Sequence, residues 1–222
     1  MTEVCADRLF GIPFALCDID PTSYNKRELI RDIKSNYRKN PNRDEWSGPC
    51  KVHHAYNDWD NQKYIKSNYS QLIEVYEKVI GDCLITFNFK ENFTFNFKIV
   101  NYNCMSGGGY MDTHSHPDVP FVGIHYIQFD PECHISTEYI NMHPYAEYQN
   151  MKGLPQMEEL LGSKDYYTSG YSKTWRLPVK EDSFCVTPGF LQHRVPVHPD
   201  TSKLRMAIIV NIDVRKTDAL LK

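Results

Sequence analysis

The sequence predicts an α+β protein whose core is an antiparallel β-sandwich or jelly roll. Amphipathic stretches with the periodicity of helices are concentrated in the first third of the chain, and segments with the two-residue alternation of strands follow. Runs of helices followed by runs of strands are typical of this class. With 222 residues, of which 41% are hydrophobic, the chain can bury a substantial core, and we expect one domain over residues 1–222.

Two helices are expected before residue 82. The first has a candidate N-cap at Thr22 or Ser23 and ends before Pro41. The second runs through residues 61–82 and closes at Gly81. Both carry an apolar stripe, so we expect residues 1–82 to form a helical part that packs on a larger core.

Residues 83–215 are expected to form that core. Phenylalanines alternate with polar residues from Phe87 to Phe97, which indicates half-buried strands. The runs "FVGIHYIQFD", "EDSFCVTPGF" and "LRMAIIVNID" indicate three more strands. A tyrosine-rich connection at about 143–180 interrupts the pattern, and such a long connection in a compact domain is expected to act as a lid.

The composition gives no sign of several common partners. A net charge of −3 and a pI near 6.3 provide no general attraction to nucleic acid or to an anionic membrane. There is no apolar run of membrane-spanning length and no signal-peptide pattern. The seven scattered cysteines contain no Cys-x-x-Cys pair, which favours a reducing compartment. We therefore expect a cytoplasmic protein; its oligomeric state is not indicated.

A metal site is indicated by "DTHSHPDVP", residues 112–120, just before an apolar strand. In extended chain, residues two apart point to the same side, so His116 and Asp118 can bind one ion. His193 follows a later strand and a Pro-Gly turn. Two histidines and one carboxylate form a facial triad that leaves positions open for Fe(II) oxygen chemistry. We therefore expect His116, Asp118 and His193 to be the catalytic metal ligands.

An inward-pointing cation accompanies these ligands. Arg205 lies twelve residues after His193, at the start of the next expected strand. The face that it shares with Ala207, Ile209 and Asn211 is largely apolar. A cation at that position is expected to turn inward and meet an anion.

These motifs resemble the Fe(II)- and 2-oxoglutarate-dependent oxygenases, and most closely a small subgroup found in phages and marine bacteria. The resemblance rests on "HSHPDVPFVGIHYIQF" and "VTPGFLQHRVPV", followed by "RMAIIVNI", and covers roughly residues 95–213. Val122, His125 and Thr187 stand where that subgroup more often has serine, tyrosine and phenylalanine. The resemblance implies a double-stranded β-helix, or cupin-like, core with the helices packed on it.

The resemblance also implies a reaction. Fe(II) would be bound by the triad, 2-oxoglutarate would chelate the iron, and its distal carboxylate would pair with Arg205. Molecular oxygen would be consumed, 2-oxoglutarate would be decarboxylated to succinate, and a substrate would be hydroxylated. That substrate would be a peptide side chain, an amino acid or a small metabolite. Expected secondary contacts to the cofactors are Tyr110, Asn101, Tyr102 and Tyr126.

Several alternatives stand beside this interpretation. His114 competes with His116 as first ligand, and His116 would then be the second member of a three-histidine site. His53 and His54 are interpreted as part of a polar loop between the helices. Two other functions are a cupin-like metalloprotein that does not use 2-oxoglutarate and a non-enzymatic β-sandwich binding module. The open triad and the inward arginine favour the oxygenase.

Overall fold

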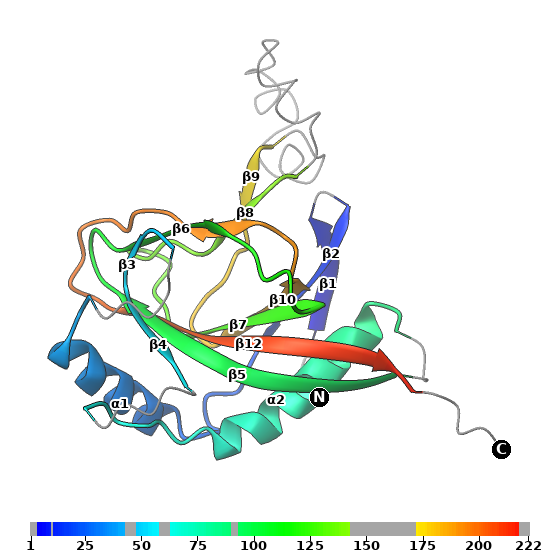
Figure 1. Cartoon of the computed structure of the whole chain (residues 1–222), viewed down its shortest axis with the longest axis horizontal. Helices are drawn as coiled ribbons and strands as arrows, with labels where there is room; N and C mark the ends of the chain where they lie inside the picture. Colours follow the sequence, from blue (N-terminus) through cyan, green and yellow to red (C-terminus); the bar gives the residue numbers. More distant parts are fainter. Residues whose placement is uncertain are drawn as a thin grey trace, which may run out of the picture.

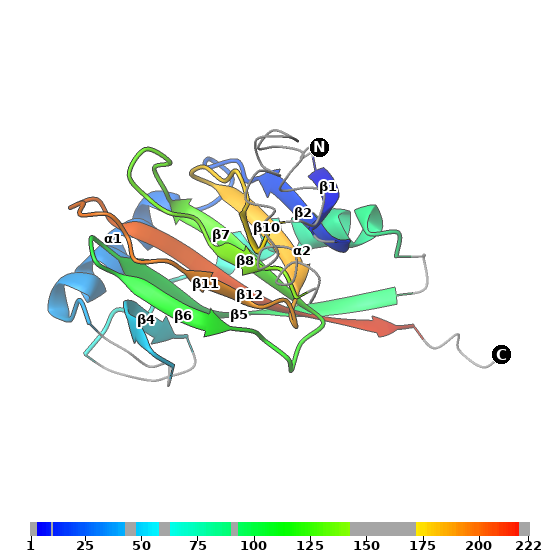
Figure 2. The ribbon, with the colours of Figure 1, turned by 90° about the horizontal axis from the view of Figure 1, so that it is seen from above.

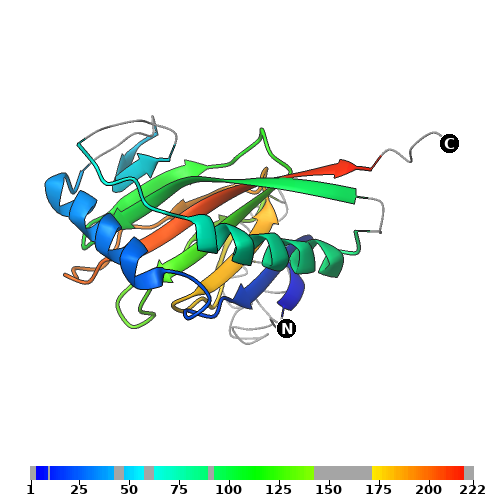
Figure 3. The same cartoon turned by 90° about the horizontal axis from the view of Figure 1, so that it is seen from below.

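Two antiparallel sheets face each other, and two helices cover the outer face of the larger one (Figures 1 and 3). The computed structural model describes residues 4–9, 11–42, 48–57, 63–89, 93–142 and 172–217. Within these ranges, no helix is both long and apolar enough to cross a membrane.

The strands fall into a seven-stranded and a five-stranded sheet, in which every pair is antiparallel. The larger sheet has the order β1 (Val4–Leu9), β2 (Ile12–Asp18), β10 (Ser183–Pro188), β7 (Phe121–Gln128), β12 (Arg205–Lys216), β5 (Phe93–Met105) and β4 (His53–Tyr56). The smaller has the order β3 (Cys50–Lys51), β6 (Tyr110–His114), β11 (His193–Val195), β8 (Glu138–Ile140) and β9 (Thr174–Arg176). Figure 2 looks down on β6 and β11 lying over β5 and β12.

Each face of the larger sheet buries its own apolar core. Toward the helices, Leu29 of α1 (Lys26–Lys39) and Tyr76 of α2 (Ser70–Thr86) pack against the sheet. Between the sheets, Ile124 of β7 packs in one cluster with Tyr139 of β8. Strand β7 contributes to both cores because successive side chains point to opposite faces. This double burial explains why its sequence reads as a continuous apolar run.

The two predicted helices are confirmed, but their ends differ from the prediction. Thr22 and Ser23 do not cap α1; both bond Asp20 in a turn that precedes the helix. Helix α2 passes through Gly81 and ends only at Thr86. A Cβ on Gly81 would lie 3.7 Å from the ring of Phe95, so this glycine faces the sheet and does not end the helix.

The strand predictions are confirmed for the three long apolar runs, which form β7, β10 and β12. The phenylalanine alternation is a strand only from Phe93 onward, because Phe87 is the C-cap of α2 and Asn88 has a φ of 64°. Residues 1–82 are not only helical, since they supply β1 to β4. These strands are short and are formed by pairing with distant segments, which local periodicity does not report. Most of the expected lid, at 143–171, lies outside the described residues.

Replacing Gly81 by alanine is expected to stabilise the protein by roughly 0.5–1 kcal/mol, because alanine has the higher helix propensity. The added methyl group would meet the Phe95 ring at an ordinary contact distance of 3.7 Å. Urea unfolding of the Gly81→Ala variant and wild type checks this, and a lowered unfolding free energy would show that the ring cannot accept the methyl group.

Candidate metal site and adjoining cavity

Three histidines converge where β6 ends and β11 begins. Antiparallel pairing of these strands places His193 directly opposite His114. His116 follows two residues later, and one ligand nitrogen from each ring lies within 4.8 Å of the other two. The ring of His193 lies 4.4 Å from that of His114 and 5.4 Å from that of His116, between centroids. Within the described residues, these are the histidine, cysteine and acidic side chains grouped closely enough for a metal ion.

Backbone carbonyls fix the tautomer of two of these rings. Nδ1 of His193 lies 2.9 Å from the carbonyl oxygen of Leu191, and Nδ1 of His114 lies 2.8 Å from that of Asp112. A carbonyl oxygen only accepts, so Nδ1 carries the proton in both rings. Nε2 of each neutral ring therefore keeps its lone pair, as metal ligation requires.

Burial keeps the three rings neutral. It lowers the pKa of His193 to about 3 and that of His116 to about 4, with a further decrease from the neighbouring histidines. Burial also lowers the pKa of His114. Metals bind the neutral form of imidazole, so the site is ready for a cation at neutral pH.

Asp118 does not join the three histidines. Its side chain is exposed, and it lies outside the group of side chains that could share an ion. The prediction for this residue assumed extended backbone between His116 and Asp118. Instead, the N–H of Val119 donates to the carbonyl oxygen of His116, which closes a turn over these residues. The turn removes the strand geometry that would have pointed both side chains the same way.

Close backbone packing holds the His116 segment in place. The N–H of His116 donates to the carbonyl oxygen of Gly189 at 2.7 Å, and the N–H of Gly189 donates to that of Pro120. A Cβ on residue 189 would lie 2.1 Å from the carbonyl oxygen of Val119. Only glycine allows this approach, so Gly189 is required for the position of the loop.

An ion-pair cluster ties His193's strand to its neighbours. Glu138 of β8 is 5% exposed and pairs with Arg194 of β11 at 2.6 Å and with Arg176 of β9 at 2.8 Å. Two arginines on one shielded carboxylate connect three adjacent strands. The residue next to His193 is therefore tied to the adjacent strand β8.

Arg205 is buried between the sheets, as the sequence predicted for an inward cation. It is 1% exposed and donates to Asn103 at 3.0 Å and more weakly to Thr137 at 3.4 Å, while its guanidinium lies 5.1 Å from the centre of the Tyr126 ring. Its Nε has no hydrogen-bond partner among the described residues. No carboxylate is paired with it there. Burying a cation without an anion is costly, so the site favours an added anion.

One cavity of about 120 Å³ joins Arg205 to the histidines. This is several times the ~10–15 Å³ that one water molecule requires. Polar residues line part of the cavity and apolar residues line the rest. The full lining consists of His54, Tyr56, Asn101, Asn103, Met111, His114, Ser115, His116, Val122, Ile124, Thr137, His193, Val195, Arg205 and Ile209.

Of the four residues expected as secondary contacts, one lines the cavity and three lie outside its lining. Asn101 lines the cavity, and its Oδ1 has no partner among the described residues. Tyr126 lies beneath Arg205 and outside the lining. Tyr110 pairs with Lys51 and does not reach the cavity. Tyr102 points to the opposite face of β5, where its hydroxyl accepts from Asn36.

Sequence reasoning missed several residues of the cavity wall, among them His54 and Asn103. His54 was interpreted as part of a polar loop, but it is 3% exposed, lies on β4 and lines the cavity. Asn103, which holds Arg205, was not singled out. The alternation in "NYNC" and "HHAY" contained the signal: alternate residues of paired strands face the same side. His53 and Tyr102 accordingly stack on the far face, with centroids 5.6 Å apart.

Comparisons with known proteins bear on the fold. No family model matches the chain, and no curated protein matches it in sequence. Among solved structures, it resembles the non-heme α-ketoglutarate-dependent carbocyclase SnoK from nogalamycin biosynthesis, with a TM-score of 0.54 and 10% identity over 94% of this chain and 83% of that one. It also resembles a Pseudomonas putida prolyl-4-hydroxylase, with a TM-score of 0.50 and 7% identity over 95% and 91%. The chain therefore has the fold of the 2-oxoglutarate- and Fe(II)-dependent oxygenases, with a double-stranded β-helix core.

Unfolding of the metal-free protein is expected to become easier as the pH falls from 7 to 5. Burial, with a further contribution from Arg205, lowers the pKa of His198 to about 4, whereas an exposed histidine titrates near 6.5. Below that value the unfolded chain binds more protons than the folded one, so stability is lost as the pH falls. His198 alone contributes up to about 2 kcal/mol of this loss by pH 5.

Chemical denaturation at the two pH values measures the loss. The His198→Gln variant, which keeps an acceptor for the N–H of Ile135, should show a smaller pH dependence than wild type. Equal unfolding free energies at pH 7 and pH 5 in wild type would contradict the expectation.

Proposed function

We propose that this chain is an Fe(II)- and 2-oxoglutarate-dependent oxygenase, and that it hydroxylates its substrate. The observation that carries the proposal is the single cavity lined by three converging histidines and a buried arginine that has no carboxylate partner among the described residues. The fold supports it, since the same core is found in solved enzymes of this chemistry. The motif order supports the more specific resemblance to the phage and marine-bacterial subgroup.

The metal would be held by His114, His116 and His193, the arrangement that the sequence left open as a three-histidine site. Imidazole suits iron, and three ligands on one side leave positions for other groups. The proposed set keeps His116 and His193 from the predicted triad and takes His114 in place of Asp118. With three histidines as protein ligands, the third protein-ligand position is not left to a halide, which favours hydroxylation over halogenation.

The part of the cavity around Arg205 supports the binding of 2-oxoglutarate. Asn103 and Thr137 hold the Arg205 guanidinium, and Nε remains available among the described residues. A carboxylate fits this planar donor group, and its charge would offset the cost of burying the arginine. The unpartnered oxygen of Asn101 lines the same cavity and can accept a hydrogen bond from a hydroxyl or a water.

The chain's own residues would position and shield the reaction. Iron with 2-oxoglutarate supplies oxidising power from molecular oxygen, which no side chain can supply. Val122, Ile124 and Ile209 form the apolar wall of the cavity and limit water beside the histidines. The substrate class stays as proposed from the sequence: a peptide side chain, an amino acid or a small metabolite.

Removing one histidine is expected to weaken metal binding by at least about tenfold, because each ring supplies one of three bonds. His114→Ala and His193→Ala should both lose affinity for Co(II), followed by its visible absorption. Asp118→Asn is the matched control and should bind within about twofold of wild type, since its carboxylate lies outside the cluster. Loss of binding in Asp118→Asn with retention in His114→Ala would establish the two-histidine, one-carboxylate set instead.

Arg205→Lys is expected to weaken 2-oxoglutarate binding by roughly 10–100-fold, as one ammonium replaces a planar donor pair. The measurement is anaerobic titration of the Fe(II)-loaded protein with 2-oxoglutarate, following the weak visible charge-transfer band of the chelate. Arg176→Lys is the control, because Arg176 is half exposed and pairs with Glu138 outside the cavity. No band in iron-loaded wild type would favour the cupin-like alternative that does not use 2-oxoglutarate.

A further inference from the structure

The outer edge of β5 carries no strand partner over Phe93–Lys98 among the described residues. Strand β12 pairs with the inner edge of β5 along its whole length. On the outer edge, β4 pairs only with residues 101–104, and Asn57 extends the contact to the carbonyl groups of Val100 and Ile99. Beyond Ile212, where the pairing of β12 with β7 ends, β5 and β12 continue as a two-stranded ribbon (Figure 1), and the outer edge of β5 stays open along Phe93–Lys98 among the described residues. An open edge is a template for pairing with another strand.

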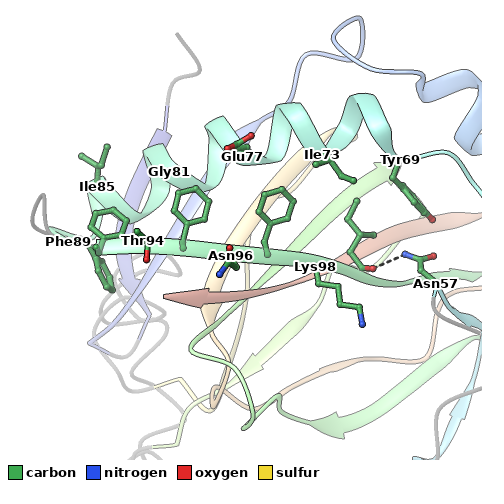
Figure 4. A pocket seen from close by; sticks show the side chains of 14 residues that line it. Asn57, Tyr69, Ile73, Glu77, Gly81, Ile85, Phe89, Thr94, Asn96 and Lys98 are labelled. Atoms are coloured by element: carbon green, nitrogen blue, oxygen red, sulfur yellow. Dashed lines mark hydrogen bonds between the residues drawn. The ribbon is translucent and has the colours of Figure 1, made fainter. Parts of the chain in front are cut away.

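An apolar groove of about 1110 Å³ runs between this edge and α2 (Figure 4). Its helical wall is a stripe of residues at spacings of four: Ile73, Glu77, Gly81 and Ile85. Ile73 is 45% exposed and Ile85 is 62% exposed, so two large apolar side chains face solvent beside the open edge. Apolar surface grouped in this way marks an interaction site more often than scattered exposed residues do.

The edge segment has little of the usual protection against pairing. It contains no proline, and Lys98 is its one charged residue. Its side chains alternate between half-buried phenylalanines facing α2 and exposed polar residues on the other face, where Lys98 points away from the helix (Figure 4). A strand with alternating apolar and polar faces and with unpaired backbone groups along one edge can pair with another strand.

The same segment is symmetric in polarity about Asn96. The order from Phe93 to Ile99 is "FTFNFKI". Two residues at equal distances before and after Asn96 are therefore either both apolar or both polar. If a second copy pairs antiparallel about a two-fold axis at Asn96, Phe95 meets Phe97 and Phe93 meets Ile99. Aromatic pairs across strands stabilise a sheet. This register places apolar side chains opposite apolar ones and polar side chains opposite polar ones, and its outermost pair meets at Ile99, next to the contact with Asn57.

We propose that this edge and groove bind a second copy of the chain through a two-fold axis. Closed two-fold symmetry requires a surface that complements itself, and both walls of the groove meet that requirement. The strand is symmetric about Asn96, and the helical stripe has an isoleucine at each end. The joined edges would make one continuous sheet across the dimer, with both α2 helices on the same face. The groove shares no residue with the histidine-lined cavity, so the inference does not depend on the proposed activity.

Sedimentation of the full-length protein over a range of concentrations tests the dimer. Wild type is expected to dimerise in the micromolar range, and Ile85→Lys and Ile73→Lys should each raise the dissociation constant at least about tenfold. Both side chains are exposed, so the folded monomer should tolerate the changes. Val197→Lys is the matched control, since Val197 is 63% exposed but lies outside the groove. A wild type that stays monomeric, or a control that dissociates as readily, would overturn the proposal.

Disulfide trapping tests the register. Residue 96 would face its own copy across the axis, so Asn96→Cys should form a 96–96 link on mild oxidation, identified by mass spectrometry of the linked peptide. In Thr94→Cys, the control, the two cysteines would lie roughly 13 Å apart, four residues at about 3.3 Å each, and should not link. Mapping by peptide separates these products from links through Cys5, which is exposed. A dimer that forms without the 96–96 link would overturn the two-fold pairing.

Discussion

The antiparallel pairing of β6 with β11 is the constraint on which the rest of the candidate site depends. It joins segments nearly eighty residues apart and places His114 opposite His193. The pairing is supported from both sides: Glu138 holds Arg194 and Arg176, and Gly189 allows the His116 loop to pack at backbone distance. A small shift in this register would separate the rings, because side chains on strands alternate between faces.

Burial has opposite consequences at the two ends of the cavity. At one end it lowers the pKa of the three histidines, which keeps them in the form that binds a cation. At the other end it surrounds a permanent cation with Asn103, Thr137 and the face of Tyr126, none of which carries negative charge. The cavity therefore combines a place for a metal cation with a place for an anion. A ligand that binds both would also stabilise the fold, since it binds the native state alone.

The seven-stranded sheet separates this chemistry from the helices. Its inner face supplies Asn101, Asn103 and Arg205 to the cavity, while its outer face packs against α1 and α2. The groove along the open edge of β5 lies on the outer face of the sheet, beside α2. A single long strand thus contributes to the candidate site near its end and to the proposed dimer contact near its beginning.

The sequence by itself determined the helices, the long strands, and the roles of His116, His193 and Arg205 as candidates, because periodicity and residue chemistry are local properties. It predicted Asp118 as the third ligand and gave His114 only as an alternative, because choosing between these two residues required the backbone path. The turn that starts at His116 leaves Asp118 outside the group, whereas the pairing of β6 with β11 brings His114 into it. The cavity role of His54 likewise depends on the register of β4 with β5, and therefore on a pairing between distant segments. Tertiary structure decides such cases because strand register, which sets the face of every side chain, is fixed by contacts far away in the chain.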